Sequence, residues 1–174
     1  MSAALVVGGA KSLDADLEAI GGLEAWDGMV VGINHAAFTF KRLDAVATLH
    51  PELVEGWRSA RRRAGFPAVP FWTHRRDPGV EAFVWQGGEV WCGGASILFA
   101  AGLARWRMDC RPVMLIGAGL DDGRDRYGTN HSDYRRYRDN WTRALEKGRL
   151  DGIVGGSPGT WLAELLARNE EAVR

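Results

Sequence analysis

The stretch Val6-Val7-Gly8-Gly9-Ala10-Lys11-Ser12-Leu13 decides the fold, because an apolar run ends in paired glycines and a helix start follows at once. A strand that ends in Gly-Gly lets the backbone approach a ligand closely. A helix that opens near Ser12 would direct unpaired N–H groups and the positive end of its dipole to the same place. The stretch therefore predicts a strand, a turn and a helix around a phosphate; a plain tight turn is the structural alternative.

Short β-branched or aliphatic runs alternate with amphipathic stretches along the rest of the chain. This alternation is typical of a parallel sheet covered by helices on both faces. The 174 residues fit one domain. The sequence therefore predicts an α/β fold, with a single Rossmann-like domain over residues 1–174 and a mostly parallel sheet. Strands are expected at 5–7, 29–33, 44–49, 69–73, 112–116 and 153–154, helices at 14–20, 51–63, from 96 onward, 132–147 and after 158, and an irregular connection at 75–88.

Composition and charge exclude several classes of function. The 22 basic residues balance 22 acidic ones, so no overall field attracts nucleic acid or an anionic membrane. No apolar run approaches the roughly 20 residues that span a bilayer, and the start of the chain lacks the pattern of a signal peptide. We expect a cytoplasmic protein in which Cys92 and Cys110 are reduced and lie outside any metal-ligand spacing.

Residues that directly follow the apolar runs are the candidates for a ligand site, because ligands of parallel sheets bind beyond the carboxyl ends of the strands. Two turns, Gly8-Gly9 and Gly93-Gly94, each precede a serine and a helix. Together they could hold one nucleotide. The full set of small or polar candidates is Gly8, Gly9, Ser12, Asn34, His35, Thr48, His50, Gly93, Gly94, Ser96, Gly117, Gly119 and Asp121.

The order of four motifs resembles that in two known families. The motifs are Gly8-Gly9-Ala10-Lys11-Ser12-Leu13, Val30-Val31-Gly32-Ile33-Asn34, Gly93-Gly94-Ala95-Ser96 and the run from Val113 to Asp121. They are similar to the ordered motifs of the bacterial sialyltransferases with a Rossmann-like fold and of archaeal hydroxymethylpterin pyrophosphokinase-like proteins. The resemblance implies a general base at His131, and contacts to a cytidine or other nucleotide from Gly8, Gly9, Ser12, Asn34, Gly94 and Ser96. The usual Gly-Asn-Gly-Pro-Ser turn is Gly-Gly-Ala-Lys-Ser here, without the asparagine expected to hold the nucleotide.

A second resemblance concerns a segment in the first half of the chain and another near its end. Arg42-Leu43-Asp44-Ala45-Val46-Ala47-Thr48-Leu49-His50-Pro51-Glu52 and Thr160-Trp161-Leu162-Ala163-Glu164-Leu165-Leu166 are similar to segments of short uncharacterised proteins encoded in tailed-phage and prophage genomes. That group supplies no activity. It implies a phage-type protein that acts in the host cytoplasm.

Histidine is the side chain best suited to proton transfer near neutral pH. His131 lies at the end of a polar connection long enough to be a lid and is the first candidate for a general base. His50 stands at a strand end, where ligand contact and a structural role weigh evenly. His35 is expected at a helix entry, and His74 in a solvated loop.

Other charged and aromatic residues allow fewer conclusions. Asp121 is the candidate ligand for Mg²⁺ over a pyrophosphate, with a solvated acidic turn as the alternative. Arg61-Arg62-Arg63 is typical of an exposed helix end, where cations complement the dipole. The eight tryptophans favour packing in the core or between subunits, so a homo-oligomer is a candidate assembly.

Together these features predict a protein that binds a nucleotide or nucleotide-sugar, with two hypotheses about activity. A transferase would release the nucleotide as leaving group while His131 or His50 deprotonates the acceptor hydroxyl. A non-catalytic phage accessory or counter-defence module would instead sequester a nucleotide or scaffold a protein contact. An oxidoreductase is a third alternative, disfavoured because the dinucleotide fingerprint is missing.

Overall fold

A computed structural model describes residues 2–82, 95–120 and 134–173. These residues form one seven-stranded sheet in the order β5-β4-β3-β2-β1-β6-β7, with every neighbouring pair parallel. The predicted α/β class with a parallel sheet is confirmed. The strands are β1 (Ala4–Val7), β2 (Met29–Ile33), β3 (Ala45–Thr48), β4 (Phe71–Thr73), β5 (Glu81–Ala82), β6 (Val113–Ile116) and β7 (Ile153–Gly155).

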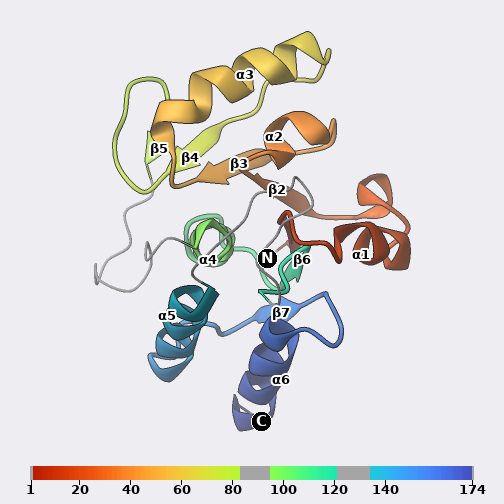
Figure 1. Cartoon of the computed structure of the whole chain (residues 1–174), viewed down its shortest axis with the longest axis vertical. Helices are drawn as coiled ribbons and strands as arrows, with labels where there is room; N and C mark the ends of the chain where they lie inside the picture. The colour runs from red at the N-terminus through yellow and green to blue at the C-terminus, as the bar shows by residue number, and fades with distance from the viewer. Residues whose placement is uncertain (1, 83–94, 121–133, 174) are drawn as a thin grey trace.

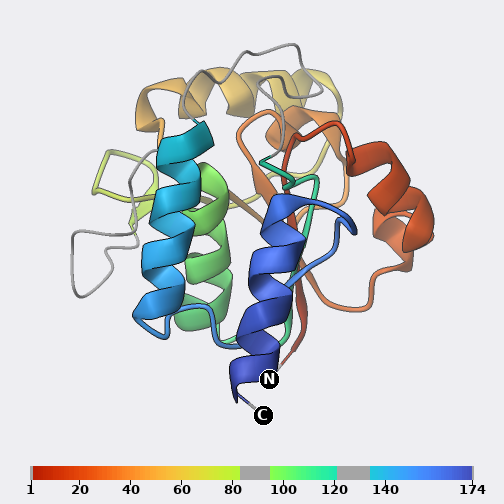
Figure 2. The same cartoon turned by 60° about the horizontal axis from the view of Figure 1, so that its bottom comes forward.

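Helices cover both faces of the sheet, as predicted (Figures 1 and 2). One face carries α1 (Leu13–Ala19), α2 (Ala36–Thr39) and α3 (Val54–Arg63), and the other carries α4 (Ser96–Gly102), α5 (Tyr134–Glu146) and α6 (Trp161–Val173). The short turns η1 (Leu23–Ala25) and η2 (Pro51–Leu53) precede β2 and α3, and α4 continues into the π-helical turn η3 (Leu103–Arg107). Within the described ranges, no helix has the length and apolar character needed to cross a membrane.

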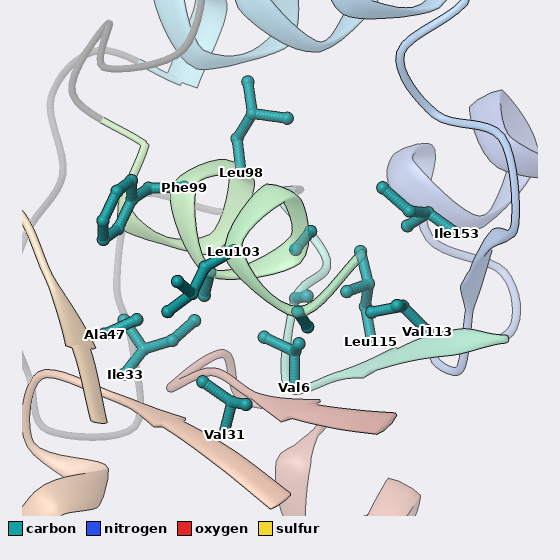
Figure 3. Close-up of a cluster of buried hydrophobic side chains, with 14 of the residues drawn as sticks. Val6, Val31, Ile33, Ala47, Leu98, Phe99, Leu103, Val113, Leu115 and Ile153 are labelled. Carbon is teal, nitrogen blue, oxygen red and sulfur yellow. The ribbon is translucent and has the colours of Figure 1, made fainter. Parts of the chain in front are cut away.

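The larger hydrophobic core lies between the sheet and α4. Val6 and Val31 project from the central strands toward this helix, and Leu103 points back at them (Figure 3). Leu98 points away from the sheet, yet it is fully buried. Because α4 has apolar neighbours on both sides, its sequence carries almost no polar residue after Ser96, as is typical of a helix enclosed in a core.

Arg61 lies in the opposite layer, and the prediction that it ends an exposed helix is wrong. Its side chain is only 2% exposed, whereas Arg62 and Arg63 are exposed as predicted. Position 61 follows the buried Trp57 by one helical turn, so it lies on the inner face of α3. There its guanidinium donates hydrogen bonds to four backbone carbonyl oxygens, and burial lowers the pKa of the side chain. The acceptors are the carbonyls of Ala37, Phe40, Lys41 and Pro67.

The sequence predicted a helix entry at His35, where α2 begins, but no range for this helix, and it did not predict β5, which lies in the connection expected to be irregular. The two elements contain four and two residues respectively, too few to produce a hydrophobic period. Core packing is confirmed for Trp57 and Trp141, which are 7% and 0% exposed, but Trp106 is 43% exposed. The Arg105 guanidinium lies 4.3 Å from the centre of the Trp106 ring, so this exposed indole has a cation–π partner within the chain.

Candidate functional site

The direction in which strands are added to the sheet changes beside β1. Strands β2 to β5 follow one another outward from one edge of β1, whereas β6 pairs with its other edge. In open parallel sheets, ligands bind beyond the carboxyl ends of the strands at such a point. Gly8 directly follows β1, and Gly117 directly follows β6.

The absence of a side chain at Gly8 allows the backbone after β1 to lie close to the backbone after β6. The Gly8 N–H donates to the Ile116 carbonyl at 2.9 Å, and the Ala10 N–H donates to the Gly117 carbonyl at 2.8 Å. A Cβ atom at position 8 would overlap the Gly117 carbonyl oxygen. The contact between β1 and β6 therefore explains the glycine, and two N–H groups of the predicted phosphate turn already have acceptors.

A buried carboxylate also lies at these two strand ends. Asp16, on α1, is 4% exposed and accepts hydrogen bonds from the Gly117 N–H at 2.8 Å and the Ser157 hydroxyl at 2.6 Å. The hydroxyl of Ser12 in turn donates to that of Ser157 at 3.3 Å. A negative charge inside the fold thus takes donors that a phosphate would need, and it repels an anion at the same place.

A second polar cluster joins the carboxyl ends of β2 and β3 to the start of α4. The side-chain oxygen of Asn34 accepts from the Thr48 hydroxyl at 2.8 Å, and its amide donates to the Ser96 hydroxyl at 3.4 Å. Asn34 has a φ of 50°, in the left-handed region that asparagine tolerates better than most residues. Asn34 and Ser96, predicted to share one site, lie together as expected. Ser12 and Gly8 belong to the neighbouring strand ends instead.

His50 continues this polar edge on the far side of Thr48. The His50 N–H donates to the Thr48 hydroxyl at 3.0 Å, and the ring Nδ1 lies 3.2 Å from a carboxylate oxygen of Glu52. Both side chains are more than half exposed, at 51% and 59%. The pKa of Glu52 is lowered, first by a hydrogen bond from its own backbone N–H and then by His50.

His74 lies beside His50, at the end of the next strand. Thr48 of β3 pairs with Thr73 of β4, so the residues that follow them emerge from adjacent strands. The Nδ1 atom of His74 is shielded from solvent and has no hydrogen-bond partner among the described residues. Burial lowers the pKa of His74, the charges of Arg75 and His50 lower it further, and Glu52 opposes them. His74 therefore lies in a loop and is partly exposed, as predicted, but its Nδ1 atom is shielded from solvent.

Several predicted site residues lie outside the described residues: Gly93, Gly94, Asp121 and His131. Their roles, and that of Mg²⁺, stay predictions. Within residues 2–82, 95–120 and 134–173, no group of three or more His, Cys, Asp or Glu side chains is placed to hold a metal ion. His35 stands at the start of α2, as expected, with its ring 5.6 Å from that of Phe38.

Asp16 was not predicted from the sequence as a site residue, although its position in the helix indicates that its side chain is buried. Leu13, Leu17 and Ile20 mark the apolar face of α1, and Asp16 lies on that face. A carboxylate among apolar positions of a short helix indicates a buried partner. His74 offered no comparable signal, because the charged residues around it are typical of an exposed loop.

Comparison of the chain with protein-family models, with curated proteins and with solved structures found no match.

Proposed function

We propose that this chain binds a nucleotide or nucleotide-sugar over the carboxyl ends of β2 and β3, beside the start of α4. The observation that carries the proposal is the cluster of Asn34, Thr48 and Ser96, in which three elements bring amide and hydroxyl groups to one point. Polar groups that converge at the carboxyl edge of a parallel sheet are typical of such a site.

The chemistry of the cluster suits a ribose or the polar edge of a base. An asparagine amide carries two donors and an acceptor oxygen, and a serine hydroxyl both donates and accepts. The bond between Asn34 and Ser96 uses one donor and one acceptor site, so the pair has capacity for further polar partners. Both residues are partly exposed, which leaves them accessible from solvent.

We expect Asn34→Ala and Ser96→Ala each to weaken nucleotide affinity by about 5- to 150-fold, because each change leaves a polar partner unsatisfied at a cost of about 1 to 3 kcal/mol. Thermal shift on the unmodified chain first selects the ligand from nucleoside mono- and diphosphates, nucleotide-sugars, dinucleotides and cyclic nucleotides. A ligand at 100 times its Kd stabilises the fold by about 2.7 kcal/mol. Calorimetry then measures the variants, with Ser59→Ala on α3 as the control expected to bind normally. The proposal fails if no nucleotide stabilises the unmodified chain.

Transfer from a nucleotide-sugar is a second candidate function, favoured by the pair of His50 and Glu52. A carboxylate at Nδ1 holds the imidazole proton on that nitrogen and leaves Nε2 as the proton acceptor. His50 would take the proton of an acceptor hydroxyl, whose oxygen bonds to the sugar carbon as the nucleotide leaves with the electrons of the broken bond. A product assay with a bound nucleotide-sugar and hydroxyl acceptors tests it; a bound ligand that is never consumed favours an accessory module that sequesters nucleotides.

A further inference from the structure

We propose that His50, His74 and Arg75 form an anion site at the carboxyl ends of β3 and β4, and that this site takes the phosphate or pyrophosphate of the ligand. The inference deepens the proposed function and rests on it for the identity of the ligand. It moves the anionic part of the nucleotide away from the glycine turn, where the sequence predicted it.

The β1–β6 end of the sheet is unsuited to an added anion. The buried Asp16 carboxylate already accepts the Gly117 N–H and the Ser157 hydroxyl there. The Gly8 and Ala10 N–H groups donate to carbonyls of the same chain. A phosphate in this place would meet a negative charge and would find the N–H groups of Gly8, Ala10 and Gly117 already engaged.

The β3–β4 end differs from the β1–β6 end, because it carries an arginine and two titratable imidazoles near its carboxylate. Two imidazoles and the exposed Arg75 side chain stand on adjacent strand ends, and Glu52 is the carboxylate beside them. Arg75 and Glu52 cancel in charge, so the net charge of the cluster is set by the protonation of the two histidines. An arriving phosphate would supply the hydrogen-bond partner and the negative charge that stabilise the protonated rings.

The anion site is continuous with the cluster of the proposed function. Hydrogen bonds lead from Ser96 through Asn34 and Thr48 to the backbone of His50. From β2 to β4 the sheet extends over two strand spacings, roughly 10 Å, which is the scale of a nucleotide. A ligand with its sugar or base over Asn34 would therefore place its phosphates over His50 and His74.

Inorganic pyrophosphate is the probe that tests the site without a known nucleotide. We expect it to raise the pKa of His74, followed through the ring C–H resonances of the four histidines by NMR, and to leave the ring resonances of His35 in place. His74→Gln and His50→Gln assign the resonances. Because binding takes up a proton, affinity should rise as pH falls from 8 to 6, by at most about tenfold per pH unit for each proton.

Neighbouring arginines provide a matched pair of variants. Both Arg75 and Arg76 are exposed, so neither replacement threatens the fold. We expect Arg75→Gln to weaken pyrophosphate binding about fivefold, through loss of a charge-assisted contact, and Arg76→Gln to change it less than twofold.

The outcomes separate the two proposals. If pyrophosphate leaves the His74 resonances and pKa unchanged, the anion site is refuted. If nucleotides bind the unmodified chain, His74→Gln and Arg75→Gln with equal affinity, the anion site is again refuted and the proposed function survives. If pyrophosphate titrates His74 but no nucleotide binds, the anion site stands and the nucleotide proposal fails.

Discussion

Replacement of Arg61 by methionine is expected to lower the free energy of unfolding by about 3 to 5 kcal/mol. Arg61 is 2% exposed and its guanidinium supplies hydrogen bonds to four backbone carbonyls, so its removal leaves those oxygens without their donor. A buried polar group that loses its partner costs about 1 to 3 kcal/mol, and methionine replaces only the apolar part of the side chain. Urea denaturation followed by circular dichroism measures the loss.

Arg62→Met is the matched control, because its side chain is 74% exposed and lies 3.9 Å from a carboxylate oxygen of Glu55. An exposed ion pair of this kind contributes at most about 1 kcal/mol. Arg61→Lys should recover only part of the stability. The planar guanidinium of arginine presents donors to four separated acceptors, whereas the compact ammonium of lysine cannot reach all four. Equal midpoints for Arg61→Met and Arg62→Met would contradict the buried role of Arg61.

Gly8→Ala is expected to destabilise the fold by at least about 3 kcal/mol. The new Cβ would overlap the Gly117 carbonyl oxygen and lie 3.1 Å from the side chain of Ile97. Because a backbone oxygen cannot turn aside as a side chain can, β1 and β6 must separate and weaken the bond from the Gly8 N–H to Ile116. The free energy of unfolding from urea titration is the quantity to compare.

Gly56→Ala provides the contrast with Gly8→Ala. Gly56 lies inside α3, and a Cβ there would have no atom within 4 Å. Alanine in a helix interior should stabilise the chain by roughly 0.5 to 1 kcal/mol. The two substitutions should therefore have opposite signs, and a Gly8→Ala variant as stable as the unmodified chain would show that β1 and β6 do not need this close contact.

The sequence predicted the fold class because buried parallel strands produce apolar runs that are visible without any tertiary information. The runs at Ala4–Val7 and Val113–Ile116 are of this kind, and both became central strands. Glu81–Ala82 was not found in this way, because it pairs only two residues with β4 at the edge of the sheet and one of the two is charged. Arg61 shows a further limit, since three of its four acceptors, the carbonyls of Ala37, Phe40 and Lys41, lie 20 to 24 residues earlier in the chain.

Part of the candidate site was predicted from the sequence. The other part could not be predicted, because a sequence does not show which polar groups already have hydrogen-bond partners within the fold. Strand-end logic placed Asn34 and Ser96 in one region, and the structure joins them by a hydrogen bond. The position of Gly8 at a strand end likewise predicted a ligand contact there. The sequence does not reveal that the Gly117 carbonyl oxygen occupies the space beside the Gly8 Cα atom. The shielding of the His74 Nδ1 atom was missed for a similar reason, since it arises only in the folded chain.

The central place of β1 also governs the order in which the chain can complete its fold during synthesis. Its neighbour β2 follows within about the next 25 residues of chain, from Met29, but its second neighbour, β6, begins only at Val113. Ser157, which donates a hydrogen bond to Asp16, lies 141 positions after it in the chain. Before these segments are made, one edge of β1 has no strand beside it and the Asp16 carboxylate remains in water, so the native contacts of β1 and Asp16 are complete only after β6 and Ser157 have been synthesised.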